Sequence, residues 1–249
     1  GSRPCVVAVE VTPIEVPTVF ILGDSTVCDQ PLEPYASWGQ MLPRFFKPQI
    51  AVANHAESGE SLRSSLSAHR VEKVLESIRK GDFLLIQYGH NDMKAVDEAT
   101  YQASLRNVAA LAREKGATVI LITPMHRRRF QGDSIQNSLK GFPDAVRQLA
   151  KEQRYPLIDL HAMSETLYEA LGPDGSGILF KAGDGTHHNN YGAYELARCV
   201  VDGIRRNESV LADFLKEDLP PFDPAHPDPV ETFQVPASPR QTTVPPEGQ

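Results

Sequence analysis

Five short apolar runs, separated by segments with helical periodicity, limit what this chain can fold into. The runs cover residues 18–23, 50–54, 82–88, 118–123 and 156–160. Apolar spacing predicts helices over 70–80, 100–115, 142–153, about 162–171 and about 190–206. Alternation of strand and helix is typical of a mostly parallel sheet with helices on both faces. We therefore predict an α/β protein with three layers and a five-stranded, mostly parallel sheet in the middle.

The domain organisation follows from the same pattern and from the distribution of proline. Residues 17–218 contain all of the alternating segments and are predicted to form one domain, preceded by a leader strand or linker at 1–16. Nine of the 20 prolines fall within 220–249, where periodicity is almost lost. We expect residues 219–249 to be a proline-rich tail, either an extended strap or a disordered end.

Charge and composition exclude several classes of protein. The formal net charge of −7 argues against a nucleic-acid partner. No apolar run approaches the ~20 residues that a membrane-spanning helix needs, so no membrane partner is expected. The three cysteines are too few and too scattered for a disulfide framework or a thiolate metal site.

Polar side chains collect at one edge of the predicted sheet. In sheets of this kind, ligands bind beyond the carboxyl ends of the strands. Each of four strands is followed there by a candidate, and the loop before the last helix supplies two more: Ser25, Gly59, Asn91, the run Arg127–Arg129, and Asp184 with His187. We expect one site at this edge.

Ser25 is the candidate nucleophile, because a buried strand ends there in Gly-Asp-Ser. A serine hydroxyl needs a base and an orienting carboxylate. Asp184 and His187 are three residues apart, so one loop can hold both. His188 is the rival base, but adjacent side chains diverge and only one can point inward. Taken singly, Gly-Asp-Ser and Asp-Gly could equally be plain turns.

An acyl-transfer enzyme also needs donors for the oxyanion, each worth roughly 3 kcal/mol in the transition state. The backbone N–H groups of Ser25 and Gly59 and the side-chain amide of Asn91 could supply three. Taken alone, Gly59 could equally be a turn glycine, and Asn91 could cap a helix.

Together these segments resemble the SGNH, or GDSL-like, hydrolase superfamily. The matching blocks are Gly23-Asp24-Ser25, Gly59, Gly89-His90-Asn91-Asp92 and Asp184-Gly185-Thr186-His187. A closer resemblance is to the rhamnogalacturonan acetylesterase family. It covers residues 17 to about 207 and runs through Gly-Asp-Ser-Thr-Val, Trp-Gly-Gln-Met-Leu-Pro, Gln-Tyr-Gly-His-Asn-Asp, Thr-Pro-Met-His-Arg-Arg-Arg-Phe and Asp-Gly-Thr-His-His-Asn.

The resemblance implies a flavodoxin-like α/β/α fold and deacetylation of a pectic polysaccharide without a metal or other cofactor. Ser25 would attack the acetyl carbonyl, His187 would act as base and then acid, and Asp184 would hold the imidazole tautomer. The partner would be an acetylated acidic polysaccharide or oligosaccharide. We expect a secreted or periplasmic protein whose signal peptide is not in this sequence, and the chain could be one domain of a longer polypeptide.

The remaining candidates concern the sugar. Arg127 or Arg129 could pair with galacturonate carboxylates through the planar guanidinium, although a solvated loop is the alternative. Five residues are predicted to bind substrate: Asp24, His90, Arg127, Arg129 and His188. Many members of the family have arginine just after the block-two glycine, whereas this chain has Glu60 there. That position should be near the site, so the difference leaves the sugar open, and acetylated xylan is an alternative substrate.

Two other functions compete with this interpretation. A metal-dependent phosphoesterase could use residues at the strand ends as ligands, namely Asp24, His90, Asn91, Asp184 and His187. Against it, no carboxylate-x-His pair follows the first strand. A non-catalytic carbohydrate-binding module would expose flat aromatic platforms, yet aromatic residues make up only 7% of the chain and lie mostly in apolar runs.

Overall fold

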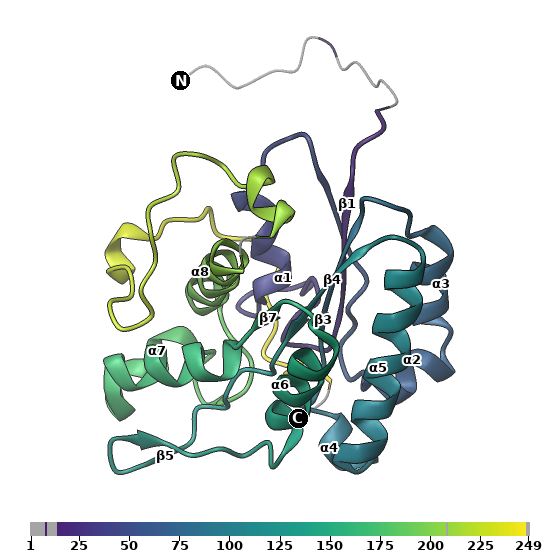
Figure 1. Ribbon diagram of the computed structural model, residues 1–249. Helices are drawn as coiled ribbons and strands as arrows, with labels where there is room; N and C mark the ends of the chain where they lie inside the picture. Colours follow the sequence, from purple (N-terminus) through teal and green to yellow (C-terminus); the bar gives the residue numbers. More distant parts are fainter. Residues whose placement is uncertain (1–7, 9–13, 208, 248–249) are drawn as a thin grey trace.

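A parallel sheet forms the centre of the protein in a computed structural model that describes residue 8 and residues 14–207 and 209–247. Its strands are β1 (Thr18–Gly23), β2 (Ala51–Asn54), β3 (Phe83–Gln87), β4 (Thr118–Ile122) and β7 (Leu157–Ile158). The strand order is β2-β1-β3-β4-β7 and every pairing is parallel (Figure 1). The predicted five-stranded α/β sheet is confirmed, with the strand order of a flavodoxin-like fold.

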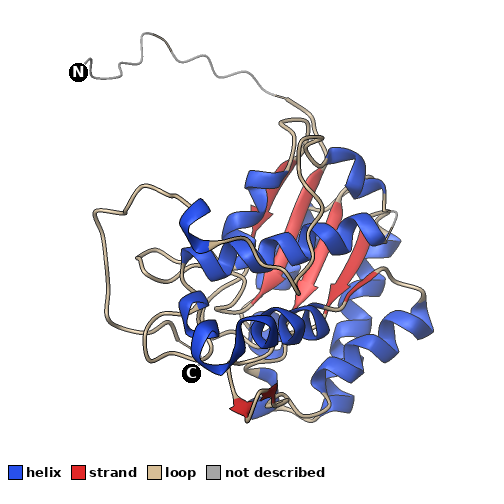
Figure 2. Cartoon of the chain, turned by 90° about the vertical axis from the view of Figure 1, so that its left-hand side faces the viewer, coloured by secondary structure: helices blue, strands red, loops and turns tan. Residues whose placement is uncertain are grey.

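Alternating residues of the strands face two separate hydrophobic cores. Ile21 and Leu85 pack against one helical layer, and Leu22 and Leu84 against the other. The first layer contains α1 (Trp38–Met41), η1 (Leu42–Phe45), α7 (Leu160–Gly175), η2 (Ser176–Leu179), α8 (Asn190–Arg206) and η3 (Val210–Phe214). The second contains α2 (Leu62–Ser67), α3 (Arg70–Ser77), α5 (Glu98–Glu114) and α6 (Phe142–Gln153). Figure 1 shows the strands between these two groups of helices, and Figure 2 looks at the sheet from the side of α7 and α8.

The sequence located the long helices well. The expected segments 142–153 and about 190–206 coincide with α6 and α8. Helix α7 runs further than expected and is kinked at Gly172, whose φ of +72° is in the left-handed region, next to Pro173. A short helix, α4 (Asp92–Ala95), follows β3 at the carboxyl edge.

A small hairpin was not anticipated. Strands β5 (Phe130–Gln131) and β6 (Ser134–Ile135) pair antiparallel just after the arginine run. Each strand has two residues, which is too short for a periodic pattern to reveal. The hairpin lies beyond the carboxyl end of β4 (Figure 1).

The proline-rich tail follows an extended path along the domain, with one short turn of 3-10 helix, η4 (Val230–Thr232). Phe222 is buried in the core of the α8 layer, and the ring of Phe233 packs on Tyr191 and Tyr194 of α8. Asp228 forms an ion pair with Arg198. The tail therefore behaves as a strap. Most of the leader predicted at 1–16 lies outside the described residues.

Within the described ranges, no helix is long and apolar enough to cross a membrane.

Candidate active site

The turn after β1 is tightly built. At Gly23, a β-carbon would lie 2.6 Å from the side chain of Val27 and 2.8 Å from the backbone oxygen of Gln87, so a larger residue would not fit. The backbone N–H of Thr26 and its hydroxyl both donate to Oδ1 of Asp24, at 2.9 and 2.7 Å. This turn presents Ser25, which is 3% exposed, at the carboxyl edge of the sheet.

Asp184 and His187 meet Ser25 across 162 residues of sequence. The Oγ atom of Ser25 lies 2.9 Å from Nε2 of His187, and Nδ1 of His187 lies 3.0 Å from Oδ2 of Asp184. The other carboxylate oxygen accepts the backbone N–H groups of Thr186 and His187, at 2.7 and 3.0 Å. The backbone of the loop therefore fixes the carboxylate of Asp184, and the fixed carboxylate in turn orients the imidazole of His187.

The charge of Asp184 is stabilised in place. Burial alone would raise the pKa of its carboxyl group, but the hydrogen bonds from the ring of His187 and from the backbone N–H groups of His187 and Thr186 outweigh burial and lower it to about 2. An ionised Asp184 keeps the proton on Nδ1 of His187. The lone pair of Nε2 then faces the hydroxyl of Ser25, which is the arrangement that a general base requires.

The two other predicted oxyanion donors lie on neighbouring loops. Gly59 has a φ of +80°, which favours glycine, and follows β2. Asn91 follows β3, is 7% exposed, and donates one side-chain N–H to the backbone oxygen of Glu60 at 2.9 Å. An amide has two N–H bonds, so one remains for another acceptor. The structure thus links the Gly59 loop to Asn91.

Glu60 lies next to the site, as its sequence position predicts, because its backbone oxygen bonds Asn91, but its side chain points toward the helices that follow. Its carboxylate accepts the hydroxyls of Ser64 and Ser65 at the start of α2 and the Nε–H of Arg70 in α3 at 3.1 Å. The side chain is therefore turned into the helical layer. Its part in the site is structural, because its backbone oxygen holds Asn91.

The three consecutive arginines point in different directions. Arg127 is half-buried and donates to the backbone oxygen of His90 at 3.1 Å. Arg128 donates to Ser176 at 2.9 Å and to the backbone oxygen of Pro173, so it braces η2. Arg129 is exposed, and no described residue accepts a hydrogen bond from its guanidinium. Of the run, Arg129 is the most available to a ligand.

Three of the predicted substrate-binding residues are enclosed by protein and bonded to it, and their contact with a sugar stays a prediction. His188 is 1% exposed, and its Nε2 lies 2.8 Å from the hydroxyl of Tyr168. Asp24 is 0% and His90 2% exposed, and Nδ1 of His90 lies 3.5 Å from Oδ2 of Asp24. The Asp24–His90 pair therefore stabilises the turn that carries Ser25.

Burial of His188 has a clear electrostatic consequence. Desolvation, together with the nearby His187, lowers the pKa of His188 to about 3. A neutral ring that is hydrogen-bonded to Tyr168 faces away from Ser25, and the adjacent His187 faces toward it.

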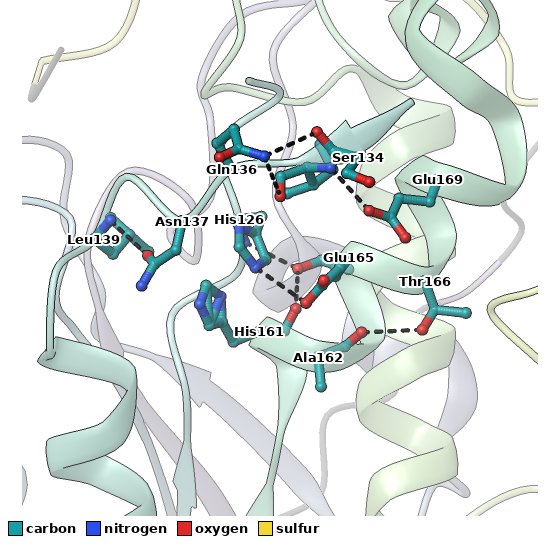
Figure 3. A network of polar contacts seen from close by, with 12 residues as sticks. His126, Ser134, Gln136, Asn137, Leu139, His161, Ala162, Glu165, Thr166 and Glu169 are labelled. Carbon is teal, nitrogen blue, oxygen red and sulfur yellow. Dashed lines mark hydrogen bonds and ion pairs between the residues drawn. The ribbon is translucent and has the colours of Figure 1, made fainter. Parts of the chain in front are cut away.

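A pair of stacked histidines at the same edge was not predicted from the sequence. The rings of His126 and His161 stack with centroids 3.6 Å apart, and Nε2 of His126 lies 3.6 Å from Glu165 of α7 (Figure 3). Burial lowers their pKa values to about 4 and about 3. The residues are 35 positions apart and share no motif, so only the fold reveals the pair.

Two residues of the loop after Ser25 also contact the site without having been predicted. The side-chain amide of Gln30 donates to the backbone oxygen of Ser25 at 2.7 Å. The ring of Tyr35 meets His187 edge-on, with centroids 6.0 Å apart. Neither residue lies in a recognisable motif.

A parallel α/β/α sheet with this Ser–His–Asp arrangement at its carboxyl edge defines an SGNH hydrolase. The family model described as "GDSL-like Lipase/Acylhydrolase family" matches residues 21–194. The chain therefore belongs to the GDSL-like lipase/acylhydrolase family, and it is a carboxylic ester hydrolase.

Individual relatives agree with this assignment. A rhamnogalacturonan acetylesterase, RhgT of Bacillus subtilis (strain 168), is 40% identical over 79% of this chain and 93% of its own. The crystal structure of the Bacillus subtilis protein YxiM superposes with a TM-score of 0.74 at 31% identity, over 80% of this chain and 58% of that one. An acetylxylan esterase from Geobacillus stearothermophilus, Axe2, shares the fold at a TM-score of 0.60 and 20% identity, over 76% of this chain and 94% of that one.

The competing phosphoesterase has no support from these relatives. Among the residues that the structure describes, no group of three or more His, Cys, Asp or Glu side chains is placed to hold a metal ion. The five residues that could have been ligands are instead divided between the serine site and the Asp24–His90 pair.

Proposed function

We propose that this protein is a serine carbohydrate esterase that removes acetyl groups from a pectic glycan of the rhamnogalacturonan type. The observation that carries the proposal is the continuous contact from Ser25 Oγ through His187 to the ionised Asp184, with separations of 2.9 and 3.0 Å. We further propose that the protein is secreted or periplasmic, as a polysaccharide substrate requires.

In the proposed reaction, Oγ of Ser25 bonds to the acetyl carbonyl carbon while its proton moves to Nε2 of His187. The resulting imidazolium is stabilised by Asp184. Collapse of the tetrahedral intermediate breaks the bond to the sugar oxygen, which takes the proton from His187. Water then attacks the acetyl-enzyme by the same path, with His187 again as base, and releases acetate.

The oxyanion of the intermediate is stabilised by the backbone N–H groups of Ser25 and Gly59 and by the free side-chain N–H of Asn91. Asn91 is held for this role by its bond to the Glu60 oxygen. Preorganised donors of this kind cost no rearrangement when the charge develops.

The pectic substrate class is supported by one relative and one side chain. The 40% identical relative is a rhamnogalacturonan acetylesterase. The exposed Arg129 lies after β4 on the catalytic edge, where its guanidinium can pair with a galacturonate carboxylate. Arg127, half-buried beside it, adds positive charge on the same side.

The test is acetate release from acetylated rhamnogalacturonan fragments, acetylated xylan and a neutral aryl acetate, by the wild type and Ser25→Ala. We expect Ser25→Ala to lose at least about 10³-fold in kcat on every substrate while its circular dichroism spectrum is unchanged. A folded Ser25→Ala protein with most of its activity would refute the mechanism. Faster release from xylan than from the pectic fragments would refute the substrate.

A further inference from the structure

We propose that the end of the C-terminal strap, Gln241–Glu247, is a wall of the sugar-binding cleft, and that Glu247 is a specificity-determining residue. Its carboxylate keeps acidic sugars away from the part of the cleft beside Gly59, so that a neutral sugar binds there. This inference rests on the proposed deacetylation of a glycan.

The strap is fixed to the loop that follows the nucleophile. The backbone N–H of Thr242 donates to the backbone oxygen of Glu33 at 2.7 Å, and the N–H of Glu33 donates to the oxygen of Arg240 at 3.3 Å. The side chain of Glu33 accepts in turn from Asn190 at the start of α8, at 3.0 Å. The strap is therefore held by backbone bonds close to the serine turn.

Beyond this anchor, the strap faces a surface cleft. Thr242 and the segment 244–247 line one side, and the other side includes Gln30, Tyr35 and Ser58. These three residues connect the cleft to the site, because Gln30 bonds the backbone of Ser25, Tyr35 contacts the ring of His187, and Ser58 precedes Gly59. A glycan whose acetyl group reaches Ser25 has this cleft beside it.

Glu247 itself lies over the oxyanion loop. A β-carbon placed on Gly59 would be 3.1 Å from Cβ and 3.3 Å from Oε2 of Glu247. The carboxylate of the strap is thus adjacent to a proposed oxyanion donor.

The charged residues that line this cleft are all acidic, and Arg129 lies outside it. Glu247 is exposed, and no cation in the described part of the chain pairs with it. Asp29 and Glu57 line the same cleft, although Glu57 is 3.3 Å from Arg70. Arg129 lies after β4, two places beyond β1 in the sheet. A sugar carboxylate is therefore attracted toward β4 and repelled from the strap.

The experiment compares kcat/KM of the wild type, Glu247→Gln and Glu247→Lys on three acetylated substrates. One carries a carboxylate on every sugar (oligogalacturonate), one on alternate sugars (rhamnogalacturonan fragments), and one has none (xylo-oligosaccharide). At low salt, Glu247→Lys should raise kcat/KM about two- to fivefold on the first substrate, with Glu247→Gln between it and wild type. The gain should be smaller on the second, zero on the third, and lost at ~0.5 M salt.

Glu231→Lys is the matched control, because it makes the same charge change in the strap at η4, outside the cleft. An equal gain from Glu231→Lys, an equal gain on all three substrates, or no gain would overturn the inference. Failure of the proposed function would give a different result. The wild type would then hydrolyse an aryl acetate but release no acetate from any glycan, and this inference would be rejected together with the proposed function.

Discussion

Replacing Asp184 with asparagine separates the two tasks that this side chain performs. Oδ1 accepts two backbone N–H groups, at 2.7 and 3.0 Å, and an asparagine oxygen can still accept both. The second oxygen, which faces Nδ1 of His187 at 3.0 Å, becomes an NH₂ group. That group donates, so the imidazole must place its proton on Nε2, where it faces Ser25 and cannot act as a base.

The expected loss is therefore large for activity and moderate for stability. The wrong tautomer should lower kcat about 10⁴-fold on an aryl acetate. For stability, the pKa of Asp184 falls from an ordinary 3.8 to about 2 on folding, which corresponds to roughly 2 kcal/mol. Because the folded pKa is depressed, this contribution is complete above pH 4 and is lost as the pH falls through 2.

Acetate release at pH 7 and urea unfolding at pH 7 and pH 3 would measure both effects. The stability difference between wild type and Asp184→Asn should shrink at pH 3. Asp97→Asn is the control, since Asp97 caps α5 by accepting the N–H of Thr100 at 2.7 Å and asparagine caps equally well. Activity of Asp184→Asn within tenfold of wild type would show that Asp184 does not set the tautomer.

Three further predictions concern other residues. His188→Phe should cost about 1–3 kcal/mol in urea unfolding, because the buried hydroxyl of Tyr168 loses its partner, and should leave kcat within twofold; a collapse of kcat in folded protein would contradict our choice of base. Asn91→Ala should lower kcat about 10²–10³-fold with little change in KM, and an effect on KM alone would make Asn91 a sugar ligand instead. The stacked His126 and His161 have depressed pKa values of about 4 and about 3, so stability should be complete above their ordinary 6.5 and fall as the pH drops toward 4. His161→Phe should make that fall shallower by up to about 1 kcal/mol per pH unit, measured by urea unfolding between pH 7 and pH 4, and an unchanged slope would exclude the pair as its cause.

The sheet and the meeting of Ser25 with His187 were predictable because both depend on periodic patterns and on a general property of parallel sheets. Buried strands such as β4 are continuous apolar runs, and residues after their carboxyl ends share one edge. No knowledge of side-chain direction was needed. The roles assigned to these residues stay predictions until variants are measured.

The direction in which individual side chains point could not be predicted from the sequence. The side chain of Glu60, which follows Gly59 beside the site, points toward α2 and α3 because Ser64, Ser65 and Arg70 satisfy its carboxylate. His188 turns to Tyr168, a partner 20 residues away. Such choices depend on which donors the fold brings close, and no local pattern records them.

The strap was equally hard to anticipate, because much of its attachment uses backbone oxygens. Arg205 and Arg198 donate to the oxygens of Pro220 and Pro221, and Thr242 is held by its own N–H. Backbone groups are the same in every residue, so composition gave only the alternatives of strap or disorder.

The position of Glu247 decides how this protein should be attached to a surface or joined to another polypeptide. Anything linked after Glu247 would leave the protein beside Gly59, next to the proposed substrate cleft. The segment leading into β1 meets the sheet at its opposite edge (Figure 1). An immobilised enzyme held before Thr18 would turn the proposed cleft away from the support, whereas a support fixed to the other end would stand beside the cleft.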